Sequence, residues 1–271
     1  MLGEQQLPER FRNIIDEEQR IFERPRRISP ARKIPDTTSI PLDDPTAWVK
    51  VPDVICVFID MMNSTKLSAD TAEHAVAGAY RLFTGTVVRL LDEFDAPYID
   101  VRGDGAFALF NRDQTHRALA AAVTAKTFID EEFVPSVRNH LDADVGSHIG
   151  IDQRLLYVRK IGFRRYGGRT DRQNEVWAGR TVNMAAKLAS KSLHNQVLVS
   201  ERFYRNLSNE KPLKSCGCES GRYTGNKTDL WTKVDLSEDK RFDFKTAYLL
   251  RSSWCRNHGR EFCESMLRAD S

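Results

Sequence analysis

An unbroken apolar run, Val54 to Ile59, limits the possible architectures more than any other part of the sequence, and it ends at a carboxylate, Asp60. Its β-branched and aromatic residues do not alternate with polar ones, which is typical of a strand covered on both faces. Such a strand needs a sheet with a layer on each side. The chain can supply those layers, because 271 residues with 41% apolar content can bury one large core.

Periodicity predicts the elements that follow this strand. Apolar residues at three-to-four-residue spacing predict a helix over 71–94, and the strand-like segments 98–102 and 106–110 flank Gly103-Asp104-Gly105, whose glycines permit a tight reversal. The order β-α-β-β-α-β predicts an α+β fold of the ferredoxin-like type, with an antiparallel sheet backed by helices. The remaining expected elements are helices over 115–133 (disturbed at Pro135), 178–190 and from a Ser200 cap to 207, strands over 145–151, 155–163 and 197–199, and a hairpin of 231–236 with 246–250.

Three regions are expected along the chain. Residues 1–45 combine an amphipathic helix over 8–23 with a Pro-rich linker, because prolines between Pro25 and Pro45 repeatedly interrupt regular structure. Residues 46–210 are expected to form the core domain. Residues 211–271 form a C-terminal hairpin and tail that complete the domain.

Composition excludes several classes of partner. No apolar run approaches the roughly 20 residues of a membrane span, and the N-terminus lacks a secretory pattern, so we expect a cytoplasmic protein with no membrane partner. A net charge of +3 gives no global reason to expect nucleic-acid binding. The basic segment 164–172 is expected to be an arm that contacts a partner subunit.

An odd number of cysteines argues against a disulfide framework. A zinc site is an open alternative for Cys216, Cys218, Cys255, His258 and Cys263, although the spacings are not the usual ones.

Two carboxylates are the candidate metal ligands. Asp60 ends the central strand and Asp104 lies at the tip of the adjacent hairpin, so strand pairing would bring them together. Mg²⁺ and Mn²⁺ take a few carboxylates plus substrate phosphates, which predicts a site for two such ions, with the carbonyl of Met61 as a further ligand. Each motif has an ordinary structural explanation, because an Asp after a strand and a Gly-Asp-Gly turn are both common.

Polar residues follow the first carboxylate directly. Asn63, Ser64 and Thr65 lead into the next helix, and a helix N-terminus offers free backbone N–H groups to a phosphate. We therefore place these three residues in the substrate-binding set.

Three segments in order, 58–65, 102–105 and 175–188, resemble the class III nucleotidyl cyclases over roughly residues 50–210. The resemblance implies that Asp60 and Asp104 bind the metals, and that Phe58 lies in the substrate site. It implies a homodimer with composite sites, in which one subunit supplies the metal ligands and the other supplies the base-recognition and transition-state residues. Among the latter, Asn183 would orient the ribose and Lys187 would meet the phosphates. The four-residue spacing puts Asn183 and Lys187 on one helix face, which is also what a solvated polar stripe would show.

Departures from the family pattern bear on the base. Asp100 and Glu175 stand where adenylyl cyclases carry a lysine and an aspartate, and a carboxylate cannot donate to adenine. Arg102 is two residues after Asp100, so in a strand both side chains point to the same face. Arg102 can donate to a base carbonyl there, or it can form a cross-strand ion pair instead. Lys187 replaces the usual catalytic arginine and lacks its bidentate fork.

These departures, the N-terminal extension and the ending 247–259 resemble the pyrimidine cyclases of bacterial Pycsar antiphage systems. The resemblance implies a uridylate cyclase that converts UTP to cyclic UMP, a second messenger for a separately encoded effector, with a cytidylate cyclase as the alternative. UTP is favoured because uracil offers both an acceptor, O4, and a donor, N3–H. The donor Arg102 and the acceptors Asp100 or Glu175 match these two groups. A palm-type nucleotidyltransferase and a degenerate cyclase domain that senses nucleotides are the competing classes, although the chain has no GG(D/E)EF signature.

Overall fold

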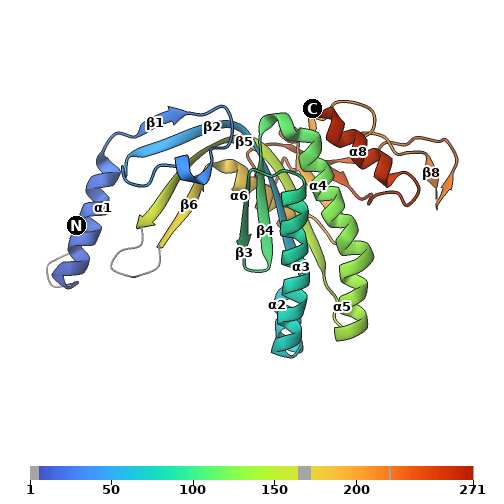
Figure 1. Cartoon of the computed structure of the whole chain (residues 1–271), viewed down its shortest axis with the longest axis horizontal. Helices are drawn as coiled ribbons and strands as arrows, with labels where there is room; N and C mark the ends of the chain where they lie inside the picture. Colours follow the sequence, from blue (N-terminus) through green and yellow to red (C-terminus); the bar gives the residue numbers. More distant parts are fainter. Residues whose placement is uncertain (1–5, 164–171, 220, 271) are drawn as a thin grey trace. The chain divides into compact units, whose positions relative to one another are not determined.

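The computed structural model describes residues 6–163, 172–219 and 221–270 (Figure 1). The expected basic arm lies for the most part outside the described residues. Among the described residues, no helix is long and apolar enough to cross a membrane.

Contacts divide the chain into two compact units. The smaller unit is formed by Met1–Val51 and Tyr157–Ala178, and the larger by Pro52–Leu156 and Gly179–Ser271. Two long strands, β2 (Ala47–Met62) and β5 (Gly146–Phe163), contribute residues to both units. The division of the sequence at residues 45 and 210 stays a prediction.

The larger unit contains most of a mixed sheet with the strand order β10-β11-β7-β5-β2-β4-β3. The predicted hairpins are present, because β3 pairs antiparallel with β4 and β10 with β11, whereas β5 and β7 run parallel. The sheet is therefore mixed and not wholly antiparallel, since a strand reached through a crossover helix can lie parallel to its neighbour. Its strands, besides β2 and β5, are β3 (Tyr98–Arg102), β4 (Gly105–Phe110), β7 (Gln196–Ser200), β10 (Trp231–Asp235) and β11 (Thr246–Leu250).

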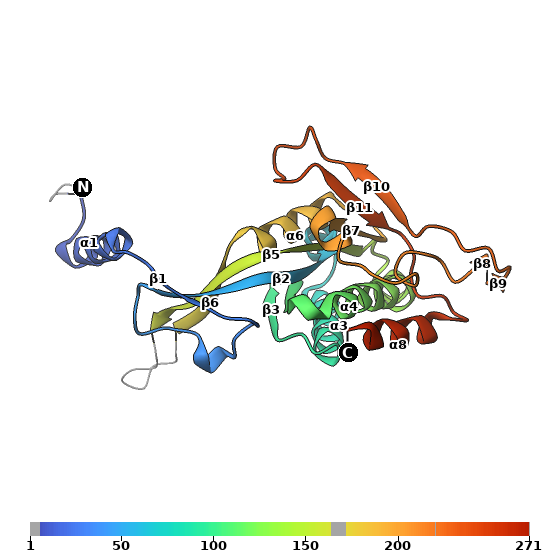
Figure 2. The ribbon, with the colours of Figure 1, turned by 90° about the horizontal axis from the view of Figure 1, so that it is seen from above.

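Helices cover both faces of this sheet. The main core is formed by the odd-numbered residues of β2, from Ile55 to Met61, against Phe83 and Leu91 of α3 (Glu73–Glu93) and alanines of α4 (Thr115–Phe128). A second cluster joins Met184 and Leu188 of α6 (Arg180–Lys191) to the opposite face. Figure 2 shows α4 and α6 on opposite sides of the β5 and β2 strands. The remaining helical elements of the unit are α2 (Ser64–Asp70), η2 (Arg112–Gln114), the π-helical η3 (Ile129–Phe133), α5 (Val134–Leu141), α7 (Glu201–Tyr204) and α8 (Gly259–Ala269).

Several features differ from the sequence-based expectations. The two strands expected over 145–151 and 155–163 form one strand, β5. The helix expected to stop near Pro135 continues as η3 and α5, because Pro135 lies in the first turn of α5, where its missing N–H is tolerated. Neither α8 nor the small hairpin of β8 (Cys218–Glu219) with β9 (Arg222–Tyr223) was expected.

The smaller unit begins with the expected amphipathic helix, α1 (Glu9–Glu23), which has no buried residue and exposes Phe11, Ile14 and Phe22. The expected Pro-rich linker contains β1 (Arg27–Pro30), which pairs parallel with β2, and η1 (Thr37–Ser39). A strand not expected from the sequence, β6 (Arg172–Ala178), pairs antiparallel with the end of β5.

Candidate active site

The two candidate metal ligands lie at one edge of the sheet. Asp60 is near the end of β2, and Asp104 occupies the turn between β3 and β4. Pairing of β2 with β4 places Gly105 against Asp60 so closely that an added Cβ would lie 2.4 Å from Asp60 Oδ1. The predicted strand pairing therefore does bring the two aspartates to neighbouring positions.

The electrostatics of this edge favour a cation. Burial, followed by the negative charge of Asp104, raises the pKa of Asp60 above its ordinary value. The backbone N–H of Met61 donates to the Asp60 carboxylate and partly opposes this shift. Two carboxylates that repel each other in a half-buried site are a donor set that a divalent cation would stabilise. The Met61 side chain, by contrast, is buried in the core, so only the backbone of Met61 could contribute to a metal site here.

One face of the sheet carries the other side chains of the site. Phe58 of β2 pairs in register with Phe107 of β4, and their rings stack with centroids 6.4 Å apart. Asp100 lies opposite Phe107 on the other side. Directly opposed residues point to the same face and alternate residues share a face, so Phe58, Asp60 and Asp100 share one face.

Asp100 and Arg102 form an ion pair on that face. The Arg102 guanidinium lies 2.5 Å from the Asp100 carboxylate, and the Asp100 side chain is 22% exposed. Both residues belong to β3, so the pair is formed within one strand and not across two. The pair places an acceptor, Asp100, next to a donor, Arg102, whose side chain is 58% exposed.

The polar residues after β2 only partly follow expectation. Asn63 adopts a left-handed conformation (φ 62°), precedes α2, and donates its side-chain amide to the carbonyl of Asp144 at 3.1 Å. Ser64 and Thr65 are the first residues of α2, a helix of seven residues. The segment leads into a helix, as expected, but the Asn63 side chain is engaged away from the helix N-terminus.

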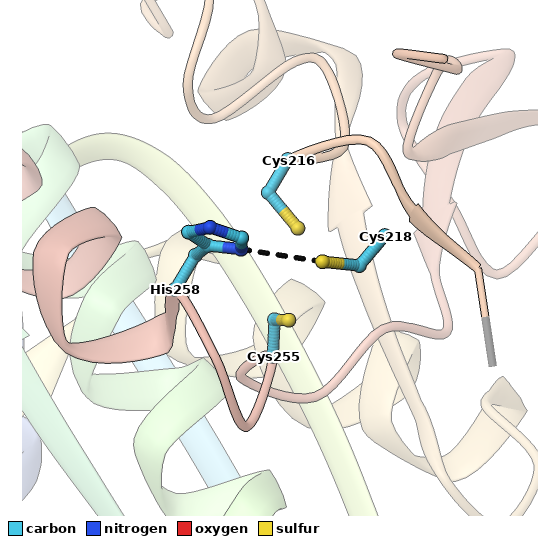
Figure 3. Close-up of side chains that lie close together, drawn as sticks. All are labelled: Cys216, Cys218, Cys255 and His258. Atoms are coloured by element: carbon cyan, nitrogen blue, oxygen red, sulfur yellow. Dashed lines mark hydrogen bonds between the residues drawn. The ribbon is translucent and has the colours of Figure 1, made fainter. Parts of the chain in front are cut away.

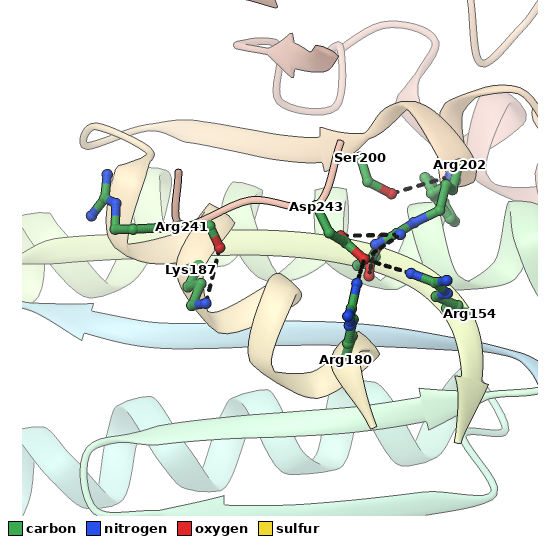
Figure 4. A network of polar contacts seen from close by, with 9 residues as sticks. Arg154, Arg180, Lys187, Ser200, Arg202, Arg241 and Asp243 are labelled. Atoms are coloured by element: carbon green, nitrogen blue, oxygen red, sulfur yellow. Dashed lines mark hydrogen bonds and ion pairs between the residues drawn. The ribbon is translucent and has the colours of Figure 1, made fainter. Parts of the chain in front are cut away.

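Asn183 and Lys187 lie on α6, as the four-residue spacing predicted. Asn183 is exposed, whereas Lys187 donates its Nζ to the backbone carbonyl of Arg241 at 3.0 Å (Figure 4). That carbonyl belongs to the loop between β10 and β11. The lysine is therefore held by a loop whose position beside α6 no local pattern of residues predicts.

The same loop contributes an aspartate with three arginine partners. Arg154, Arg180 and Arg202 all meet the Asp243 carboxylate, at 2.5, 3.0 and 3.1 Å (Figure 4). Although burial opposes ionisation, hydrogen bonds from Arg202 and Arg180 lower the pKa of Asp243. This network fixes the loop over the first turn of α6, and no local motif in the sequence could have shown it.

His148 is a further polar residue of the site face that sequence reasoning missed. It lies on β5 between the buried Ser147 and the core residue Ile149, and its Nδ1 donates to the carbonyl of Ser192 at 2.8 Å. The electrostatic interaction with His148 lowers the pKa of Asp60, against the raising effects of burial and Asp104. The alternation of polar His148 with core residue Ile149 was the available signal.

Glu175 belongs to the smaller unit. It lies on β6 opposite Lys160, and its carboxylate accepts a hydrogen bond from the hydroxyl of Thr37. Its second oxygen, Oε2, is buried and has no hydrogen-bond partner among the described residues. A buried carboxylate oxygen without a hydrogen-bond partner is uncommon in proteins.

Comparison with known proteins places this arrangement in a family. Residues 48–222 match the adenylate and guanylate cyclase catalytic domain, and the chain belongs to this family. It is 33% identical over 237 residues to a uridylate cyclase of Micromonospora echinofusca, with 86% of this chain and 74% of the relative covered. It is 35% identical over 236 residues to a uridylate cyclase of Propioniciclava tarda, with 85% and 74% covered.

A solved structure supports the fold. The adenylyl cyclase CyaB from P. aeruginosa superposes with a TM-score of 0.58 at 17% identity, over 76% of this chain and 96% of that one. The expected class of nucleotidyl cyclase and its α+β fold are therefore confirmed.

Proposed function

We propose that this protein is a uridylate cyclase, which converts UTP to 3′,5′-cyclic UMP and pyrophosphate. The ribose 3′-oxygen attacks the α-phosphorus in line, the bond to pyrophosphate breaks, and the 3′-hydroxyl proton is lost. The observation that carries the proposal is one sheet face with two parts: paired carboxylates, Asp60 and Asp104, and the ion pair of Asp100 with Arg102. The similarity to two uridylate cyclases supports the choice of base.

The ion pair matches the edge of uracil. Uracil offers O4 as an acceptor and N3–H as a donor, which the Arg102 guanidinium and the Asp100 carboxylate complement. Because Arg102 contacts Asp100 directly, a donor and an acceptor lie side by side before a base arrives. Adenine needs a donor to N1, and the ionised Asp100 cannot provide one.

The metal site is proposed to hold two Mn²⁺ or Mg²⁺ ions. Asp60 and Asp104 would be the protein ligands, with a backbone carbonyl near Met61 as a third. When bound, such ions lower the pKa of the attacking hydroxyl and neutralise phosphate charge. The residues fit this role because the mutual repulsion of the two carboxylates is what a divalent cation relieves.

A homodimer with composite sites is proposed to complete the active centre. In a two-fold dimer the same patch of both subunits meets. Each site would therefore combine Asp60 and Asp104 of one subunit with the base-contacting Asp100 and Arg102, and with Asn183 and Lys187, of the other. The exposed Phe11, Ile14 and Phe22 of α1 are apolar area of the kind that association covers. In this arrangement Glu175 would be a further acceptor for the base.

The product assay tests the choice of base. Purified protein is incubated with Mn²⁺ and each of ATP, GTP, CTP and UTP, and the products are identified by mass spectrometry. Cyclic UMP as the main product is expected. Cyclic CMP would move the assignment to a cytidylate cyclase, a purine product would refute the role of Asp100, and no product with any nucleotide would favour a nucleotide sensor.

Complementation tests the shared site. Asp60→Ala and Asn183→Ala are each expected to be inactive, and mixing them should recover up to about a quarter of wild-type activity, because a random mixture forms one intact site in half of its dimers. Mixing two preparations of Asp60→Ala is the matched control. Activity that stays absent in the mixed sample, with dimers shown by light scattering, would contradict a composite site.

The proposed biological role of the product is in antiphage defence. The cyclic nucleotide would activate a separately encoded effector during infection, so phage protection in cells should require both the effector gene and an intact Asp104. Protection that survives Asp104→Ala would show that defence does not depend on the cyclase reaction.

A further inference from the structure

Four side chains far from the cyclase site converge at the C-terminal end of the larger unit. Cys216, Cys218, Cys255 and His258 have ligand atoms that all lie within 4.8 Å of one another, and Figure 3 shows them pointing toward a common centre. Cys218 Sγ lies 3.2 Å from Nδ1 of His258. A tetrahedral zinc ion, with bonds of about 2.3 Å to sulfur and 2.0 Å to nitrogen, separates its ligand atoms by about 3.5 to 3.8 Å. The observed distances between ligand atoms, from 3.2 Å for Cys218 and His258 to an upper limit of 4.8 Å, include that range.

We propose that these four residues form a structural zinc site with a closed Cys₃His ligand set. This site is independent of the proposed cyclase reaction and of the metals of that reaction. Thiolate and imidazole ligands select zinc over the oxygen-seeking Mg²⁺ and Mn²⁺. Four protein ligands leave no open position for substrate, which is the pattern of structural and not catalytic zinc.

The first ligand pair is built by a tight turn. Gly217, between Cys216 and Cys218, has φ +85°, and its carbonyl accepts from the backbone N–H groups of Thr224 and Gly225 at 2.8 and 3.1 Å. An added Cβ at Gly217 would lie 3.0 Å from the Gly225 backbone. A glycine is therefore required for the turn that directs both thiols to one side.

The second ligand pair lies in the loop before α8. Cys255 and His258 are separated by two residues, and the backbone N–H groups of Asn257 and His258 donate to the Cys255 sulfur. Backbone donors of this kind stabilise the thiolate that a metal requires. The Asn257 side chain also donates to the carbonyl of Gly221 at 2.8 Å, which joins the loop to the β8 and β9 hairpin.

Burial contributes little to the stability of the described residues of the hairpin. Neither β8 nor β9 has a buried residue, and each strand has only two residues. A short two-stranded hairpin is marginal in water unless something crosslinks it. The loop that carries Cys255 and His258 is attached to the core. Trp254 donates its indole N–H to Thr124 of α4 at 2.8 Å, and Met266 of α8 is 4% exposed. The metal would therefore attach the hairpin to the core through α8.

Cys263 provides the matched control. It lies on α8 only five residues beyond His258, it is half-buried against the core, and it is outside the cluster. All five cysteines are free thiols in the structure. Replacing Cys263 removes a neighbouring thiol without touching the proposed ligands.

The experiment measures zinc in the purified full chain by plasma mass spectrometry after passage over a chelating resin. About one zinc per chain is expected for the wild type, for Asp60→Ala with Asp104→Ala, and for Cys263→Ser, whereas Cys218→Ser and His258→Ala should lose at least about nine tenths of it. Chelator should expose three additional reactive thiols in the wild type. Cobalt substitution should give the thiolate charge-transfer and tetrahedral d–d absorption, and His258→Cys should keep cobalt but shift that spectrum toward a four-thiolate ligand set.

Several outcomes would overturn the proposal. Wild-type protein that carries no zinc and binds no cobalt, with its thiols either fully reactive or linked as a disulfide, would refute the site. Equal loss of zinc in Cys263→Ser and Cys218→Ser would show that the ligands are wrongly assigned. If Cys218→Ser fails to fold, the wild-type stoichiometry and the His258→Cys spectrum still decide the question.

Discussion

Replacing Gly105 by alanine tests how the sheet positions the metal-binding edge. An added Cβ would lie 2.4 Å from Oδ1 of Asp60 and 3.0 Å from the backbone oxygen of Ile59. Ordinary contacts begin near 3.4 Å, so the Asp60 carboxylate must move by about 1 Å. The backbone at Gly105 itself presents no obstacle, because its φ is not in the left-handed region. The substitution thus displaces a proposed metal ligand without deleting it.

The size of the effect follows from that displacement. A misplacement of about 1 Å in a reacting centre can cost about 100-fold in rate, so kcat/KM should fall by about 100-fold. Overpacking of this buried position should also lower the free energy of unfolding by about 1 to 3 kcal/mol. Initial rates of pyrophosphate release at several Mn²⁺ concentrations, together with urea unfolding, measure the two quantities separately.

Gly78→Ala is the matched control. Gly78 lies in α3 with no atom within 4 Å of its added Cβ, so the same chemical change should leave the rate unchanged and stabilise the helix by about 0.5 to 1 kcal/mol. Full activity in Gly105→Ala, with unfolding intact, would refute the argument that this glycine holds Asp60 in place. Loss of activity in Gly78→Ala would show that the assay responds to any glycine replacement.

Two further predictions concern stability. His116 is buried against Asp270, whose hydrogen bond raises the pKa of the imidazole although burial opposes it. The stabilisation is therefore complete below the unfolded value of 6.5 and is lost as pH rises through the folded pKa, so urea unfolding from about pH 6 to 9 should show a decline that is absent in His116→Gln. A wild-type decline no larger than that of the variant would contradict this linkage. Gly150→Ala should lower Tm by about 6 to 12 °C, from a cost of about 3 kcal/mol, because its Cβ would lie 2.1 Å from the backbone oxygen of Ala185 in α6. An unchanged Tm in calorimetry would show that α6 can move away from β5 at no cost.

Local patterns predicted most of the elements. The spacing of apolar residues predicted α1, α3 and α6, and the Ser200 cap of α7 is present, with its side chain accepting from the N–H of Phe203. These features depend on residues only a few positions apart. The paired strands around Asp104 were also predictable, because glycines on both sides of it permit the reversal.

Contacts between residues far apart in the sequence were harder to predict. The Asp243 network, the carbonyl that holds Lys187 and the position of His148 near Asp60 each join segments separated by tens of residues. The five C-terminal polar ligands could be noted in the sequence, but nothing local separated Cys263 from the other four.

The sequence by itself determined the class of protein, because strand-end carboxylates and the 175–188 pattern are local and ordered. Only the tertiary structure decided which polar groups meet: that Asp100 pairs with Arg102 within its own strand, and that Cys216 and Cys218 reach Cys255 and His258. The physical reason is that periodicity fixes which face a side chain points to, whereas the packing of the whole core fixes which other chain segment lies opposite that face.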